Sequence, residues 1–374
     1  MKSPLISALL FVFALPLGLA APAKQEGPVP TQALVSVDPK STPPASASAL
    51  TVIVNDHKQP VSAWEPVTPA NAQVALLIDD GLLETALSSE LNNLRSFVRS
   101  LPPGIEITVG YMHNDQVTAL PFTTDHELAA SKLRLPQGMA GLNSNPYICI
   151  SNFVKSWPNS ATPAATSSPR KARFILMLSD GVDPTYSNGQ GDARAAKQAA
   201  EAAASVAATN QALQSQAAQL QSQAQQSQVA QSQLAGQQQS AQMQLLTQQT
   251  HAQGQQALLQ ESPFVKAAVE DAQRAGVAID GIYYSNGSRT GGLTYLLQIA
   301  QGTGGTNYFE GGNGNPVSTA PFLQQFQRSI AQTYIATFNA PAIDNPQHDL
   351  VHVKFTAAKT KLHAPEAVRP GNVE

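Results

Sequence analysis

The sequence predicts an α/β fold in which a doubly wound, mostly parallel sheet carries helices on both faces. A small flanking β element and a long helical insertion rich in Ala and Gln are expected in addition. The sheet is predicted because long apolar runs, typical of strands buried on both faces, alternate with segments of helical apolar spacing. Strands are expected at residues 74–79, 105–111, 173–181, 277–284 and 307–309, with an antiparallel edge partner at 116–122.

Between these strands, apolar residues recur at the three- and four-residue spacing of amphipathic helices. The first helix is expected to run from Glu84 to Leu101, where Pro102 and Pro103 stop it. Further helices are predicted at residues 125–133, 146–157, 265–274, 293–299 and 322–333. These elements make up a main domain spanning residues 72–333.

The flanking β element is predicted from segments on either side of this domain. Residues 50–56 are β-branched, and the region 49–71 is expected to pack on the flanking element. Residues 334–360 are predicted to form a C-terminal β hairpin, and residues 361–374 a tail.

The N-terminus has the pattern of an export signal. Lys2 precedes an apolar run that ends near Leu19, and small residues suited to signal peptidase follow. Residues 1–20 are therefore predicted to be a signal peptide, with an uncleaved anchor as the alternative. Residues 21–48, rich in Pro, Ala and Ser, are predicted to be a disordered linker. The mature protein is expected to be periplasmic or secreted, with no stable membrane span.

Composition excludes several classes of function. Among 374 residues there are 22 Lys and Arg against 25 Asp and Glu, so the net charge of −3 argues against a nucleic-acid partner. Cys149 is the single cysteine, which rules out an intramolecular disulfide and a thiolate metal cluster. No nucleophile-elbow or dinucleotide-binding motif occurs at the predicted strand ends.

Three motifs in order resemble the von Willebrand factor type A (vWA) domain family. They are Leu-Leu-Ile-Asp ending at Asp79, Ile-Leu-Met-Leu-Ser-Asp-Gly ending at Gly181, and Ile-Ala-Gln-Gly-Thr-Gly-Gly ending at Gly305. The C-terminal part is similar to the secreted, acidobacterial-type variety of this family. The resemblance covers about residues 72–341 apart from the insertion, and it implies a Rossmann-like fold and a cation-dependent adhesion site.

The resemblance places Asp79 and Asp180 at two metal-ligand positions of that adhesion site. The family's two loop serines are replaced by Gly81 and Leu83, which have no side-chain oxygen, whereas Mg²⁺ prefers six oxygen ligands. For the threonine of the second loop, the candidates are Asn143, Ser144 and Asn145, and Asp80 is a candidate substitute carboxylate. We therefore predict a degenerate, empty metal site with no cofactor; Mg²⁺ or Mn²⁺ would be the ion if the altered site binds one.

The insertion spans residues 192–262 and consists mostly of Ala, Gln and Ser. Val206, Leu213 and Leu220 are seven residues apart and form a thin heptad seam. A helical hairpin that turns near Gly236 is the preferred interpretation, followed by one long helix and by a disordered loop. The insertion either docks a partner or a second copy, or is an expansion without a dedicated role.

Three functions follow as hypotheses. The first is a non-catalytic, exported binding or scaffold protein that contacts an unidentified protein partner, or itself, without metal. The second is a metal-dependent adhesion module with altered ligands. The third is an exported hydrolase that uses the carboxylates of Asp79, Asp80 and Asp180. The first is preferred, so no catalytic residue is assigned.

Overall fold

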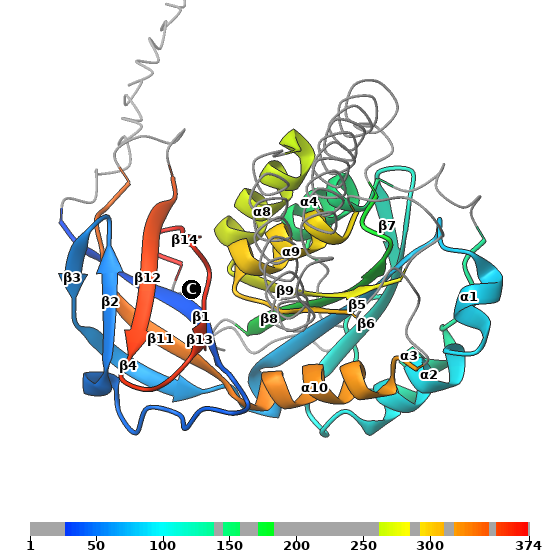
Figure 1. Ribbon diagram of the computed structural model, residues 1–374, viewed down its shortest axis with the longest axis horizontal. Coiled ribbons are helices and arrows are strands. Elements are labelled where there is room, and N and C mark those ends of the chain that lie inside the picture. The colour runs from blue at the N-terminus through cyan, green and yellow to red at the C-terminus, as the bar shows by residue number, and fades with distance from the viewer. Residues whose placement is uncertain are drawn as a thin grey trace, which may run out of the picture.

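The computed structural model describes residues 27–137, 145–157, 171–182, 262–284, 292–309, 318–343 and 349–372. Within these ranges the chain forms a six-stranded α/β part and, beside it, a β-sandwich of two four-stranded sheets (Figure 1). The chain begins in the sandwich, passes through the α/β part, and returns to the sandwich. The α/β part is therefore inserted between two strands of the sandwich.

The six-stranded sheet has the order β10-β9-β8-β5-β6-β7. All neighbouring strands are parallel except β7, which pairs antiparallel with β6 at one edge. This order confirms the predicted doubly wound sheet. The strands are β5 (Ala72–Asp79), β6 (Glu106–His113), β7 (Gln116–Ala119), β8 (Ala172–Ser179), β9 (Val277–Tyr283) and β10 (Asn307–Tyr308).

Helices cover both faces of this sheet, as predicted (Figure 1). On one face, Leu77 and Met177 belong to a core shared with α4 (Pro146–Lys155), α8 (Pro263–Ala275) and α9 (Gly292–Thr303). On the other face, Leu76 and Leu176 belong to a core shared with α2 (Leu91–Ser100), α3 (His126–Ser131) and α10 (Ala320–Ala331). The alternation of adjacent strand residues between the two cores follows from the two-residue period of a strand.

The single helix expected from Glu84 to Leu101 is wrong, because two helices occupy this segment. They are α1 (Glu84–Ser88) and α2, and Glu90 lies in the break between them. The Glu90 side chain is buried, and its Oε2 accepts hydrogen bonds from the backbone N and Oγ1 of Thr319, at 2.8 and 2.6 Å. Burial would raise the pKa of Glu90, but the hydrogen bonds from Thr319 and Asn93 outweigh it and lower the pKa. The break between α1 and α2 thus places the charged Glu90 side chain against Thr319, at the start of α10.

The sandwich consists of the sheets β13-β1-β11-β4 and β14-β12-β2-β3. Its core contains Val35, Val52, Phe338 and Phe355, and the last two rings meet edge to face at 5.6 Å. The strands are β1 (Val29–Val37), β2 (Leu50–Val54), β3 (His57–Gln59), β4 (Val61–Pro66), β11 (Thr333–Ala340), β12 (Val351–Ala357), β13 (Leu362–His363) and β14 (Ala367–Val368). Two 3-10 turns, η1 (Ala47–Ala49) and η2 (Pro69–Asn71), complete the N-terminal segment.

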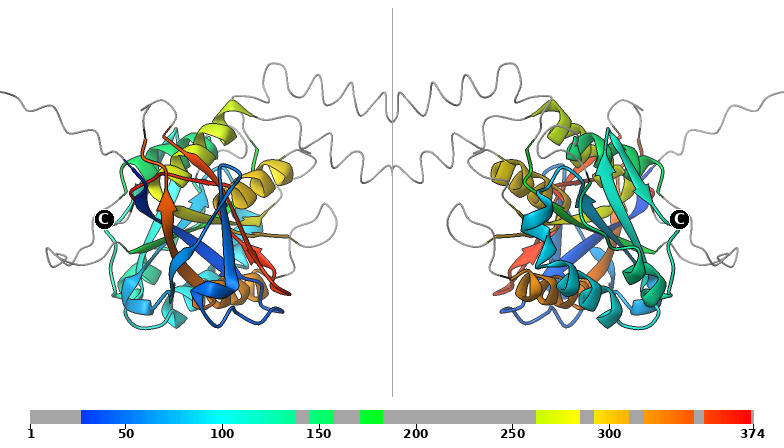
Figure 2. Two further views of the ribbon diagram at one scale, coloured as in Figure 1. Left: turned by 90° about the vertical axis from the view of Figure 1, so that its left-hand side faces the viewer. Right: turned by 90° about the vertical axis from the view of Figure 1, so that its right-hand side faces the viewer.

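Three boundary predictions around the sandwich are wrong. The expected linker at residues 21–48 contains β1, a nine-residue strand that pairs with β11 along its length. The expected hairpin at residues 334–360 does not form, because β11 pairs with β1 and β4 while β12 pairs with β2 in the opposite sheet. The expected tail at residues 361–374 contributes β13 and β14. Figure 2 shows the resulting interleaving of N-terminal (blue) and C-terminal (orange and red) strands.

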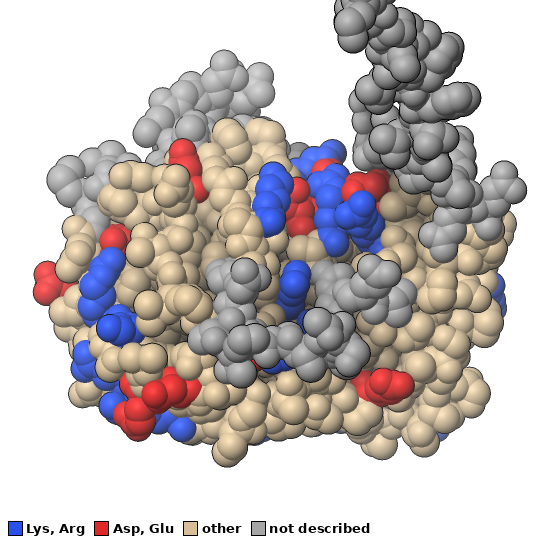
Figure 3. Space-filling model, turned by 180° about the vertical axis from the view of Figure 1, so that it is seen from behind, with Lys and Arg blue, Asp and Glu red and all other residues tan. Residues whose placement is uncertain are grey.

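The predicted signal peptide and almost all of the insertion lie outside the described residues. Ser262, placed at the end of the insertion, instead caps α8: its Oγ accepts from the backbone N of Phe264 and Val265. No helix in the described ranges is both long and apolar enough to cross a membrane. The face in Figure 3 is largely uncharged, and several of its acidic side chains lie close to basic ones, as fits a charged fraction of 13%.

Candidate functional site

The structure brings Asp79 and Asp180 to adjacent strand ends. Asp79 closes β5, Asp180 follows β8, and the two strands pair in parallel with Ile78 opposite Leu178. Both side chains are almost fully buried, with 1% and 5% of their surface exposed. This is the carboxyl edge of the sheet, where open α/β folds bind ligands.

The carboxylate of Asp79 is held by protein donors on both oxygens. Its Oδ1 accepts from the backbone N of Gly81 at 2.8 Å, and its Oδ2 accepts from the Oγ of Ser179 at 2.7 Å. The same Ser179 oxygen accepts from the backbone N of Gly181 at 2.9 Å. Ser179 therefore links the two loops through one hydroxyl group.

The turn that contains Asp180 is enclosed by backbone. Its Oδ1 accepts from the backbone N of Val182 at 2.9 Å, and the hydroxyl of Tyr147 donates to the carbonyl of Gly181 at 2.8 Å. Gly181 has φ of +68°, a region that favours glycine. A Cβ on Gly292, at the start of α9, would lie 1.9 Å from the Asp180 carbonyl oxygen. Close backbone contact thus fixes this turn against α9.

Asp80 is paired with an arginine. Its two carboxylate oxygens accept from Nη1 and Nη2 of Arg134 at 2.7 and 3.1 Å, and Oδ1 also accepts from the backbone N of Gln137 at 2.9 Å. The guanidinium lies 3.8 Å from the ring centroid of Tyr111, and its hydrogen bonds with Asp80 raise the pKa of Arg134. The role of substitute metal ligand does not fit Asp80, because a cation already occupies both oxygens.

The described residues do not fit an octahedral divalent cation. Gly81 and Leu83 offer no side-chain oxygen, and Leu83 is 41% exposed. Asn143 and Ser144 lie outside the described residues, and the side chain of Asn145 donates to Asp115 after β6. Within the described ranges, no three His, Cys, Asp or Glu side chains are grouped as a metal site. Mg²⁺ requires a fuller oxygen shell than these residues supply.

The sequence reasoning missed Ser179 and Arg134. Ser179 is part of the motif that ends at Gly181 and precedes Asp180, and this position is the signal that its hydroxyl lies at the same strand end. Arg134 is 54 residues from its partner Asp80. No local pattern connects residues at that separation, so only the fold reveals this pair.

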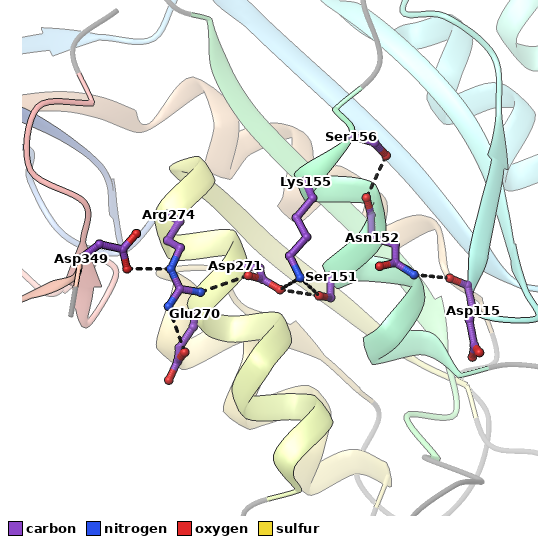
Figure 4. Close-up of polar contacts among 9 residues, drawn as sticks. All are labelled: Asp115, Ser151, Asn152, Lys155, Ser156, Glu270, Asp271, Arg274 and Asp349. Carbon is purple, nitrogen blue, oxygen red and sulfur yellow. Dashed lines mark hydrogen bonds and ion pairs between the residues drawn. The ribbon is translucent and has the colours of Figure 1, made fainter. Parts of the chain in front are cut away.

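A second polar cluster joins α4, α8 and the sandwich (Figure 4). The carboxylate of Asp271 accepts from the hydroxyl of Ser151, and Lys155 Nζ lies 2.8 Å from it. Arg274 contacts Asp271 and also Asp349, at 3.1 and 2.8 Å. Ser151 and Lys155 are not arranged as a nucleophile and base, because the lysine is ion-paired and the hydroxyl already donates to Asp271. The cluster is a structural link between the two parts of the molecule.

Asp280 is a buried carboxyl group on β9, between the sheet and α10. Its Oδ1 accepts from the backbone N of Thr306 at 3.0 Å and lies 3.3 Å from the hydroxyl of Tyr308. Burial raises the pKa of Asp280 to about 7. The residue is enclosed in the core rather than directed toward the carboxyl edge.

Comparisons with known proteins add little to this geometry. No protein-family model matches the chain, and no curated protein sequence matches it. Among solved structures, human COPII-coat protein Sec24c is 8% identical with a TM-score of 0.40, and the match covers 82% of this chain and 44% of that one. The ArnB paralog VWA2 from Sulfolobus acidocaldarius is 9% identical with a TM-score of 0.31, covering 91% and 76%.

The chain spans less than half the length of the Sec24c chain. Both TM-scores are below 0.5, so the α/β class is assigned from the sheet order of this chain. Neither likeness assigns a family, an activity or a partner to this chain.

Proposed function

We propose that the protein is an exported, non-catalytic binding or scaffold protein that contacts a protein partner without a metal ion. The loops at the carboxyl edge of the six-stranded sheet would form the contact surface. The observation that carries this proposal is that the Asp79 and Asp80 carboxylates are hydrogen-bonded to protein donors. Each has both oxygens bonded to protein donors, from Gly81 and Ser179 for Asp79 and from Arg134 for Asp80.

The composition of this edge supports binding over catalysis. A carboxylate that acts as general acid, base or nucleophile must reach a substrate, whereas Asp79 and Asp80 are buried and face internal donors. Leu83, an exposed aliphatic side chain on the same loop, suits a protein interface better than a hydrated ion. A metal-dependent adhesion module and a carboxylate hydrolase have no comparable observation in their favour.

Export rests on the N-terminal sequence pattern alone. The proposal predicts that the protein leaves the cytoplasm and that the mature chain begins near residue 21. Intact-mass measurement of the protein from the extracytoplasmic fraction tests this directly. Recovery of the uncleaved chain in the cytoplasm would contradict it.

A photo-crosslinking amino acid at Leu83, in cells that naturally make the protein, tests the contact surface. The matched control carries the same amino acid at Lys354, an exposed position on β12. We expect a discrete crosslinked partner from position 83 only, with equal yield in EDTA and in Mn²⁺. Equal crosslinking at both positions, or a crosslink lost in EDTA and restored by Mn²⁺, would overturn the proposal.

A further inference from the structure

A groove lies beside Asp80, between the segment α1–α2 and the chain that follows α3. It has a volume of about 520 Å³, within the range of about 300–1,000 Å³ of ligand-binding clefts. The residues that matter here are Glu84, Leu91, Arg95, Leu133, Leu135 and Pro136. In Figure 1, α1, α2 and α3 gather at one end of the sheet, beyond β6.

Polar and apolar side chains line the groove in similar measure. Leu133 and Pro136 are buried beneath it, while Leu91 and Leu135 are half-buried and present aliphatic surface. Leu83, 41% exposed, directly precedes α1 and Glu84. Leu91 and Leu135 therefore give the groove an aliphatic surface against which an apolar side chain of a partner can pack.

The groove also holds the guanidinium of Arg95, some of whose N–H donors make no hydrogen bond to the residues that the structure describes. Arg134 forms an ion pair with Asp80, but Arg95 has no acidic partner within 4 Å among the described residues. Nη2 of Arg95 donates to the carbonyl oxygen of Leu133 at 2.9 Å, which orients the group. An arginine has five N–H donors in a planar fork that matches a carboxylate. The remaining donors are therefore suited to bind an anion from outside.

We propose that this groove binds a short peptide segment of the protein partner that has an acidic residue next to a large aliphatic or aromatic one. The peptide carboxylate pairs with Arg95, and the apolar side chain packs against Leu91 and Leu135. Glu84, exposed at the groove, disfavours peptides with several acidic residues. This inference rests on the proposed function, because it names the chemistry of a partner segment at the same edge.

A randomised heptapeptide display library, panned on the folded protein, tests the inference. We expect enrichment of peptides with Asp or Glu beside Leu, Ile, Phe or Met. A synthetic peptide from the enriched set should bind Arg95→Gln at least 10-fold more weakly than wild type. The matched control is Arg99→Gln, one turn further along α2, where Arg99 pairs with Glu127 on the surface. It should bind like wild type, and Glu84→Gln should bind at least twofold more tightly at low salt.

A change in the peptide makes the test independent of protein folding. Replacing its acidic residue by the corresponding amide should weaken binding to wild type at least 10-fold. No enrichment, enrichment of basic peptides, or equal binding by Arg95→Gln and Arg99→Gln would overturn the inference. If the groove test fails while the crosslink at Leu83 persists in EDTA, the peptide inference is wrong and the proposed function stands. If that crosslink is also absent, both are wrong.

Discussion

Replacing Ser179 by alanine tests how the Asp79 carboxylate is held. The hydroxyl group of Ser179 is completely buried and makes two contacts at once. It donates to Asp79 Oδ2 at 2.7 Å and accepts from the backbone N of Gly181 at 2.9 Å. Ser179→Ala removes a donor from a buried carboxylate and the acceptor of a buried N–H group, and it leaves the side-chain volume almost unchanged.

The expected cost follows from these two contacts. A hydrogen bond to a charged group contributes about 1.5–3 kcal/mol, and a buried group left without its partner costs about 1–3 kcal/mol. Because one hydroxyl serves both contacts and the loop can relax in part, we expect a loss of about 3 kcal/mol in the free energy of unfolding. Urea denaturation followed by circular dichroism measures this loss.

Ser156→Ala is the matched control. Ser156 is exposed at the end of α4, where its hydroxyl donates to the carbonyl of Asn152. Its substitution should change stability by less than about 0.5 kcal/mol. A Ser179→Ala protein as stable as the control would refute this account of Asp79. So would a loss of stability that Mn²⁺ reverses, because the carboxylate would then have an ion as its partner.

Three further predictions concern the loops and the core. Gly292→Ala should lower the free energy of unfolding by about 2 kcal/mol, because a Cβ would lie 1.9 Å from the carbonyl oxygen of Asp180. Thermal denaturation measures this loss, and unchanged stability would contradict the close contact. Burial raises the pKa of Asp280 to about 7, so the folded state keeps a proton that the unfolded chain releases above about pH 4. Stability should therefore fall as the pH rises from about 4 to 7, by at most ~1.4 kcal/mol per pH unit from this residue. Asp280→Asn should lack that slope in denaturation measured between pH 4 and 8. Parallel stability profiles for the two proteins would show that Asp280 is not the source of the slope. Arg134→Met should lower the free energy of unfolding by about 2 kcal/mol, a value reduced because the arginine side chain is 35% exposed. Adding Asp80→Asn should recover more than half of that loss. Additive losses in this double-mutant cycle would show that the pair is not coupled.

The sequence was sufficient for the parts of the fold that depend on local pattern. Apolar runs such as the one ending at Asp79 became central parallel strands, because a strand covered on both faces must be apolar throughout. Asp125 was expected to open a helix, and its side chain accepts from the backbone N of Leu128. The helix predicted at residues 265–274 forms as α8, and Gly276 closes it with a φ of +61°.

The sandwich was harder to predict because its pairings are non-local. The inward side of β1 includes Thr31 and Ala33, which make its alternation of apolar residues weak. Val35 in β1 lies opposite Tyr334, about three hundred positions away along the chain. Strands β11 and β12 are neighbours in sequence, which favoured a hairpin, yet each completes a different sheet.

The candidate site was predictable in position but not in its bonding. Two aspartates at the ends of predicted parallel strands had to meet at one edge of the sheet, and Asp79 and Asp180 do. The structure shows that Ser179 bonds to Asp79 and that Arg134 bonds to Asp80. These contacts depend on side-chain geometry between loops, which the sequence does not specify locally. Residue type alone left these carboxylates as metal ligands, catalytic groups or structural acceptors.

Calorimetric titration of the folded protein with Mn²⁺ tests the central claim most directly, with Asp180→Ala as the comparison. If the carboxylates at this edge are satisfied by protein donors, wild type and variant should both show no saturable heat up to millimolar Mn²⁺. A stoichiometric binding isotherm in wild type that Asp180→Ala abolishes would contradict the account.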